Sequence, residues 1–100
     1  MKILLTTNKT YRGMPDSSEW YVHEPLRALG HDVLLYDTVV GNGRPYNETI
    51  ESFKPDLIFC MLTGDALVAP NEPWEDLAKE TASGRTKTFN WFCDDTWRFE

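Results

Sequence analysis

The sequence predicts a single α/β domain, with a parallel sheet in a Rossmann-like or flavodoxin-like three-layer sandwich. Apolar runs of strand length occur at residues 2–7, 32–37 and 56–62, and a fourth begins at residue 88. A helix-like pattern separates each run from the next, and such alternation is typical of parallel strands joined by right-handed crossovers. The 100 residues, of which 41% are hydrophobic, suffice for one domain with a modest core, at residues 1–100.

The first strand, at residues 2–7, runs into a polar loop at residues 8–15. A helix is expected next, because residues 16–19 have the spacing of a capping box, and Gly30 is placed to end it. Pro25 falls inside this pattern, where it would remove a hydrogen bond, so we expect a kink or a fresh helix start there. The apolar face of the helix consists of Val22, Leu26 and Leu29.

The second strand, at residues 32–37, is followed by a turn-rich loop at residues 41–45. Asn47 is expected to cap a short helix, because its side-chain oxygen can accept from a free backbone N–H of the first turn. That helix ends before Pro55, which disfavours helical geometry in the residue preceding it. Its apolar members are Ile50 and Phe53.

The third strand, at residues 56–62, is apolar almost throughout, which predicts burial on both faces and therefore a central position in the sheet. This favours the strand order 2-1-3-4 over the alternative 3-2-1-4. A third helix starts at Asn71 or Pro73 and stops at Gly84. Glu72 falls in its predicted first turn, where a carboxylate suits the helix dipole. The predicted inward face of this helix consists of Trp74, Leu77, Ala78 and Thr81.

The composition and charge exclude several classes of protein. A net charge of −6 argues against nucleic acid as a partner, since phosphate binding requires a basic face. Cys60 and Cys93 lie in apolar surroundings without the spacing of a redox or zinc motif, which indicates buried, reduced thiols. The apolar run at the N-terminus turns polar at Thr6, too early for a signal peptide or a membrane span. A cytoplasmic protein is therefore expected.

Familiar site motifs are absent from the sequence. The first strand is followed by no glycine-rich dinucleotide fingerprint, and there is no phosphate-binding loop motif and no His/Cys cluster with zinc-ligand spacing. A phospho-receiver domain has a similar outline but needs acidic residues after its first and third strands. Here those positions hold Thr7, Asn8, Met61 and Leu62.

The remaining polar residues converge on one edge of the predicted sheet, because ligands bind at the carboxyl ends of parallel strands. A carboxylate there accepts hydrogen bonds from ligand hydroxyls and can act as a general base, while an aromatic ring packs on apolar C–H faces. A polyhydroxylated ligand therefore fits this edge. The loop after the first strand contributes Asn8, Lys9, Tyr11 and Arg12, the loop after the third contributes Thr63, Gly64 and Asp65, and the tail after the fourth contributes Asp94, Asp95, Trp97 and Arg98.

Two other interpretations of the tail stay open. Asp94 or Asp95 would cap a following helix, with Trp97 in the core. Alternatively, both carboxylates would bind a metal ion, although adjacent residues of a strand point to opposite faces and a shared metal requires the chain to turn there. We predict no metal site.

Three segments resemble a known superfamily. Residues 26–33, LRALGHDV, are similar to the L-x-x-x-G-H-x-V segment that opens the second strand in many GT-B glycosyltransferases. Residues 53–58, FKPDLI, resemble the K-P-D-L-I run that leads into a later strand of the same enzymes. Residues 91–98, WFCDDTWR, are similar to the W-x-x-D-D-x-x-R run of the spore-maturation, glycosyltransferase-like branch. Together the resemblance covers nearly the whole chain.

The resemblance implies the N-terminal, acceptor-side half of an enzyme that transfers a sugar from a nucleotide-sugar donor to an acceptor hydroxyl. The implied partners are the nucleotide sugar as co-substrate, a glycan or small-molecule acceptor, and a C-terminal domain that binds most of the donor. No further cofactor is implied. Asp94 or Asp95 would be the general base or a sugar ligand, Trp97 a stacking platform, and Arg98 a phosphate or carboxylate partner.

The chain departs from the family in its length and in its first loop, where Gly13 is the only glycine. A domain of this size alone is expected to be inactive. The alternative hypothesis is a stand-alone α/β domain for binding or protein interaction, without catalytic activity.

Overall fold

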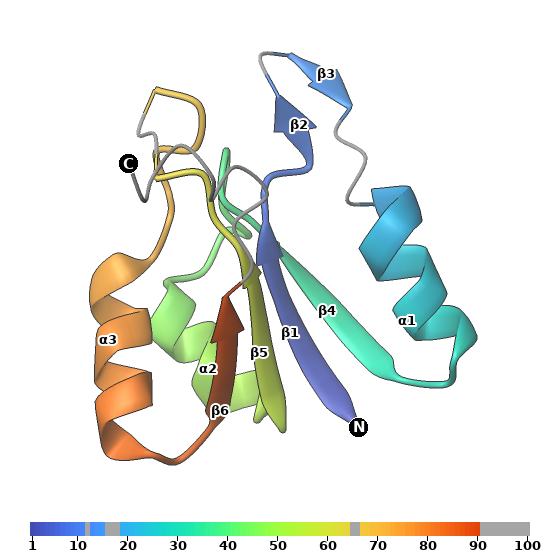
Figure 1. Ribbon diagram of the computed structural model, residues 1–100. Helices are drawn as coiled ribbons and strands as arrows, with labels where there is room; N and C mark the ends of the chain where they lie inside the picture. Colours follow the sequence, from blue (N-terminus) through green and yellow to red (C-terminus); the bar gives the residue numbers. More distant parts are fainter. Residues whose placement is uncertain (12, 16–18, 65–66, 91–100) are drawn as a thin grey trace, which may run out of the picture.

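The computed structural model describes residues 1–11, 13–15, 19–64 and 67–90 (Figure 1). Its main sheet has four parallel strands in the order β4-β1-β5-β6, which is the predicted order 2-1-3-4. The α/β, Rossmann-like fold is therefore confirmed. The strands are β1 (Lys2–Thr7), β4 (Asp32–Asp37), β5 (Leu57–Met61) and β6 (Lys87–Asn90).

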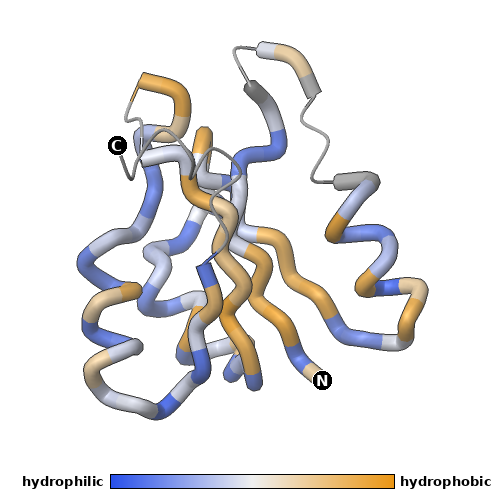
Figure 2. Tube along the Cα trace, in the orientation of Figure 1, coloured by the Kyte–Doolittle hydropathy of each residue, from blue (hydrophilic) through white to orange (hydrophobic). Residues whose placement is uncertain are grey.

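One face of the sheet holds the hydrophobic core. Helices α2 (Tyr46–Phe53) and α3 (Trp74–Ser83) cover this face (Figure 1). The strands beneath them are mostly hydrophobic in sequence (Figure 2). Alternate strand residues point to this face, as the pleat requires. The core consists of Leu4, Tyr36, Tyr46, Ile50, Ile58, Cys60, Leu62 and Leu77.

Two polar side chains in the core, Thr6 and Tyr46, are paired with each other. The hydroxyls of Thr6 and Tyr46 lie 2.7 Å apart, and burial raises the pKa of Tyr46 far above its ordinary value. Burial likewise raises the pKa of the Cys60 thiol to about 12, so this cysteine stays protonated and unreactive at neutral pH. The structural role predicted for Cys60 fits this environment, whereas Cys93 lies outside the described residues.

The first helical segment has the fresh start expected from Pro25. A π-helical turn (Glu19–His23) gives way to α1 (Glu24–Ala28), in which Pro25 occupies the first turn, where no hydrogen-bonded N–H is needed. Gly30, with φ 92°, ends the helix as predicted. Its N–H donates to the Arg27 carbonyl and that of His31 to the Leu26 carbonyl, which is the Schellman arrangement.

Helix α2 begins two residues earlier than expected. Tyr46 is its first residue and Pro45 its cap, so Asn47 is not the cap. The reason is tertiary: Tyr46 is buried against β1, and the Thr49 N–H and hydroxyl both donate to the Pro45 carbonyl. The predicted end before Pro55 is confirmed, with Lys54 in the left-handed region at φ 52°.

The inward face predicted for α3 is wrong in three of its four members. Leu77 is buried, but Trp74, Ala78 and Thr81 are exposed, and the second buried residue is Glu80. Arg85 explains this burial, because its guanidinium donates to both carboxylate oxygens of Glu80, at 2.6 and 3.2 Å, and to Glu51 at 2.6 Å. These hydrogen bonds hold the pKa of Glu80 below its usual value. The helix itself begins at Trp74, directly after Pro73.

The third strand is less deeply buried than predicted. Ile58 and Cys60 are buried on the core face, whereas the opposite face of β5 is only half-buried. On that face the rings of Phe59 and Phe89 lie 5.3 Å apart, and Phe89 is 54% exposed. Helix α1 lies toward the β4 side of the sheet (Figure 1), so it does not cover this part of the second face.

The loop after β1 contains structure that the sequence did not indicate. The short strands β2 (Thr10–Tyr11) and β3 (Met14–Pro15) pair antiparallel, and Gly13 adopts φ 83° between them. This hairpin projects beyond the carboxyl end of β1 (Figure 1). Among the described residues, no helix has the length and apolar character needed to cross a membrane.

Candidate functional site

The carboxyl ends of β1, β4 and β5 form one edge of the sheet, and we call the loops that follow them the carboxyl edge. The register aligns Thr7 with Asp37 on one side and with Met61 on the other. Of the residues predicted to bind substrate, Asn8, Lys9, Thr63 and Gly64 lie in these loops, and Tyr11 lies in β2 of the hairpin. The other predicted site residues lie outside the described part of the chain, namely Arg12, Asp65, Asp94, Asp95, Trp97 and Arg98.

Asp37 joins the first two loops of the carboxyl edge. It is the last residue of β4 and is 8% exposed. Its Oδ1 accepts hydrogen bonds from the backbone N–H of Lys9, at 3.3 Å, and of Val39, at 3.0 Å. Asn8 is similarly buried and donates from Nδ2 to the Thr10 carbonyl at 3.0 Å. A carboxylate and a carboxamide are thus held in fixed positions where the strands end.

Two buried hydroxyls lie at the same edge. Thr7 and Thr38 are at most 1% exposed, and among the described residues neither Oγ1 has a hydrogen-bond partner. Their backbones are joined, since the Thr38 N–H donates to the Thr7 carbonyl at 3.0 Å. Buried polar atoms without partners are uncommon in folded proteins because each carries a desolvation cost. Atoms enclosed to this degree are suited to a buried water molecule.

Glu72 occupies the loop after β5. Its carboxylate accepts from the backbone N–H of Thr63 at 2.5 Å, from the Thr63 hydroxyl at 3.2 Å, and from the Gly64 N–H at 3.0 Å. Gly64 has φ 72°, and successive N–H groups in such a turn form a concave site for an anion. The anion in this structure is the protein's own carboxylate. Glu72 therefore precedes α3 and braces a loop, a role different from the predicted one in the first turn of the helix.

Asn71 joins the same region to β4. Its backbone N–H donates to the Thr38 carbonyl and its Nδ2 to the Val39 carbonyl, both at 2.8 Å. With Glu72 beside it, the segment before α3 is fixed to the loops after both β4 and β5. The carboxyl edge is consequently a braced surface with its backbone groups held in place.

We expect Glu72→Ala to lower the free energy of unfolding by about 1–2 kcal/mol, since hydrogen bonds to a charged group contribute about 1.5–3 kcal/mol and this one is only half-buried. Amide exchange at Thr63 and Gly64 should accelerate, whereas exchange in β1 should follow global stability alone. Glu75→Ala is the control, because Glu75 is exposed in the first turn of α3, and it should change stability by about 0.5 kcal/mol or less. Equal effects of the two variants would contradict a bracing role for Glu72.

Sequence reasoning missed Asp37, Asn71 and Glu72 as residues of this edge. A signal existed for Asp37, since an acidic residue at the end of the second strand is where dinucleotide-binding folds bind a ribose hydroxyl. No local signal existed for Glu72 or Asn71, because their partners are backbone groups of other loops.

No group of His, Cys, Asp or Glu in the described ranges is arranged to hold a metal ion. Asp94 and Asp95 fall outside those ranges.

Comparisons with protein-family models, with curated proteins and with solved structures found no match to this chain.

Proposed function

We propose that this chain is the acceptor-side domain of a glycosyltransferase, which transfers a sugar from a nucleotide-sugar donor to an acceptor hydroxyl. The observation that supports this most is the polar carboxyl edge, where Asp37 and Asn8 are held in place by hydrogen bonds at the ends of neighbouring strands. In open α/β sheets this is the edge at which ligands bind. The W-x-x-D-D-x-x-R resemblance of residues 91–98 supports the particular chemistry.

The donors and acceptors at this edge suit a ligand rich in hydroxyls. A sugar hydroxyl both donates and accepts, so it suits an edge where a carboxylate and a carboxamide, those of Asp37 and Asn8, are held in place. An anionic group is less suited to the loop after β5, because Glu72 already occupies the N–H groups of Thr63 and Gly64. This distribution favours an acceptor sugar over the phosphates of the donor.

In the proposed reaction, Asp94 or Asp95 removes the proton from the acceptor hydroxyl. The acceptor oxygen then forms a bond to the anomeric carbon of the donor sugar, and the bond from that carbon to the nucleoside diphosphate breaks. Arg98 neutralises a phosphate or a carboxylate, and Trp97 stacks on a sugar face. A C-terminal domain supplies most contacts to the donor.

The test is an NMR titration of the labelled chain with a panel of oligosaccharides and, separately, with UDP- and GDP-sugars. We expect oligosaccharides to shift the amide signals of Lys9, Thr38 and Gly64 at the carboxyl edge, at concentrations of about a millimolar, which is typical of weak sites. The internal control is the amino edge, at Gly30 and Asp56, whose signals should stay in place. Shifts confined to the amino edge, or none with any saccharide, would overturn the proposal.

A second candidate function is a stand-alone protein-interaction domain. One observation favours it: Phe89, in β6 at the end of the sheet formed by the described residues, is 54% exposed beside the ring of Phe59. Light scattering together with the saccharide titration separates the two candidates. A self-associating chain that ignores every saccharide would support interaction, and a monomer that binds saccharides would support the glycosyltransferase.

A further inference from the structure

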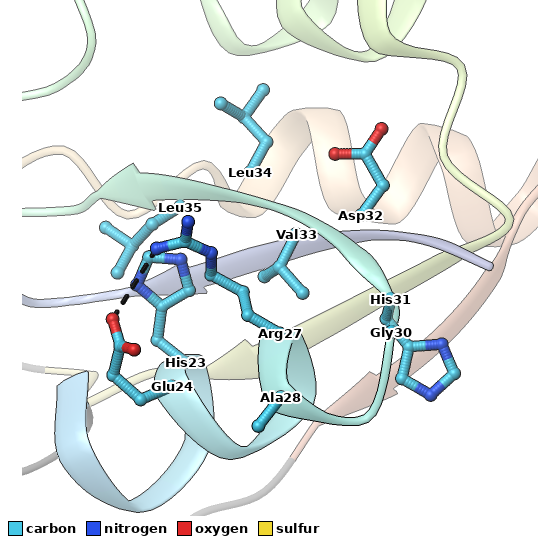
Figure 3. A pocket seen from close by; sticks show the side chains of 10 residues that line it. All are labelled: His23, Glu24, Arg27, Ala28, Gly30, His31, Asp32, Val33, Leu34 and Leu35. Atoms are coloured by element: carbon cyan, nitrogen blue, oxygen red, sulfur yellow. Dashed lines mark ion pairs between the residues drawn. The ribbon is translucent and has the colours of Figure 1, made fainter.

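A cavity of about 770 Å³ lies between helix α1 and strand β4, away from the carboxyl edge. Figure 3 shows that α1 forms one wall and β4 the other. This volume is within the range of about 300–1,000 Å³ that ligand sites occupy. The cavity borders a free strand, because β4 is at the end of the sheet and pairs only with β1 in the described residues. The lining residues used below are Glu24, Arg27, Asp32, Val33, Leu34 and Leu35.

The hydrogen bonds of β4 show which of its backbone groups face outward. The N–H groups of Asp32 and Thr38 donate to carbonyls of the first strand segment, at Met1 and Thr7. In a parallel ladder, alternate residues direct both their N–H and their C=O to the same neighbour. Even-numbered residues of β4 therefore pair with β1, and the backbone groups of Val33, Leu35 and Asp37 point to the free edge.

Asn42 covers part of this edge. Its Nδ2 donates to the Leu35 carbonyl at 2.9 Å, and its Oδ1 accepts from the Asp37 N–H at 3.2 Å. One side-chain carboxamide thus makes the two bonds that a peptide group of a neighbouring strand would make. The N–H and C=O of Val33 and the N–H of Leu35 remain without a ladder partner in the described part of the chain.

We infer that the uncovered stretch of β4 at Val33–Leu35 binds an extended, cationic peptide segment of a partner protein, which adds to the sheet as a fifth strand beside α1. Main-chain hydrogen bonds at a sheet edge supply affinity in this mode of recognition, and pockets for alternate side chains supply specificity. The side chains of Val33 and Leu35 lie on the face of β4 opposite to Leu34, which packs on the core (Figure 3). Apolar side chains of the segment would contact this α1-facing side, and its other side chains would lie next to Asp32.

The negative charge of Asp32 and of the whole chain favours a cationic peptide at this edge. Asp32 is exposed at the start of the strand and forms no ion pair among the described residues, whereas Glu24 is paired with Arg27 at 3.5 Å. The chain as a whole carries a net charge of −6, which attracts a cationic segment and opposes a second copy of the same chain. The bordering helix also favours an extended peptide over a second folded copy, because a second copy would bring its own α1 to this edge.

The test uses a blocked hexapeptide that alternates valine and lysine, with a valine–glutamate hexapeptide as the charge control. At saturating concentration the lysine peptide should slow amide exchange at Val33 and Leu35 at least about fivefold, the equivalent of one hydrogen bond of about 1 kcal/mol. The Leu34 amide is the internal control, because it already faces β1 and should not change. Binding should weaken as salt is raised. The inference would be overturned if the lysine peptide slowed exchange equally at Leu34 and Leu35, or if the glutamate peptide bound as tightly as the lysine peptide.

Two variants sharpen the test. Val33→Pro removes an outward N–H and leaves the ladder with β1 intact, and it should weaken peptide binding at least about fivefold. Asn42→Ala uncovers the Leu35 carbonyl and the Asp37 N–H, and it should strengthen binding by a similar factor. Unchanged affinity in folded Asn42→Ala protein would contradict the edge as the site. Concentration-dependent protection of Val33 without any peptide would instead indicate pairing between copies and overturn the cationic partner.

Discussion

On the proposed function, asparagine in place of Asp94 or Asp95 is expected to lower sugar transfer about a hundredfold or more, with little change in thermal stability, when it is assayed together with a donor-binding domain. A positioned general base contributes about 10²–10⁴ to a rate, and asparagine cannot accept the proton of the acceptor hydroxyl. The measurement is turnover of the nucleotide-sugar donor and acceptor that the titration identifies, together with the melting temperature of each variant. One of the two variants should lose most activity, and it identifies the base.

The choice of asparagine separates the catalytic interpretation from a helix cap. Asn and Asp are about equally good at the cap position, so a capping aspartate replaced by asparagine would leave both stability and transfer unchanged. Alanine at the same position would then cost about 1 kcal/mol of stability. Wild-type transfer rates in both asparagine variants would therefore contradict a catalytic role for this pair and support the cap.

The fold could be predicted because its main determinants are local. The strand at residues 32–37 has the predicted bounds. Helices also start or end where predicted, at Pro25, at Gly30 and before Pro55. Proline and glycine fix the backbone through their own geometry and need no distant partner. Strand order also followed from the sequence, because the most apolar strand is central.

The errors on helix α3 come from contacts that the spacing of its apolar residues does not reveal. Glu80 reads as a surface residue of α3, yet its carboxylate is buried and pairs with Arg85, which also pairs with the exposed Glu51. Trp74 reads as core by its spacing, but it lies at the start of the helix and is 46% exposed. Apolar spacing identified the helix, whereas the burial of Glu80 depends on its ion pair with Arg85.

The candidate site was predictable only as a location. The carboxyl edge follows from parallel strands, and Asn8, Lys9, Thr63 and Gly64 lie there as topology requires. The hydrogen bonds of Asp37, Glu72 and Asn42 could not be predicted in the same way. Each joins a side chain to backbone groups of another loop or strand, and nothing in the residue types specifies such a pairing.

Leu4→Ala is expected to lower the free energy of unfolding by about 3 kcal/mol, within the range of about 2–5 kcal/mol for buried leucines. Leu4 is fully buried in the middle of β1, with Leu34 on one side and Ile58 on the other. Both neighbours are fixed by the sheet ladder, so they cannot move to fill the cavity. For a domain of this length, with a total stability of about 5–15 kcal/mol, the melting temperature should fall by about 15 °C.

Leu29→Ala is the matched control, because the same methyl groups are removed from a side chain that is 75% exposed at the end of α1. It should change stability by about 0.5 kcal/mol or less. Urea unfolding of both variants is the measurement, and the slope with denaturant should stay constant if only the native core is affected. A loss below about 1 kcal/mol for Leu4→Ala would show that the sheet relaxes into the space. In that case the core around α2 and α3 would be looser than its burial indicates, and the rigidity required of the carboxyl edge would have to come from Asp37, Asn71 and Glu72 alone.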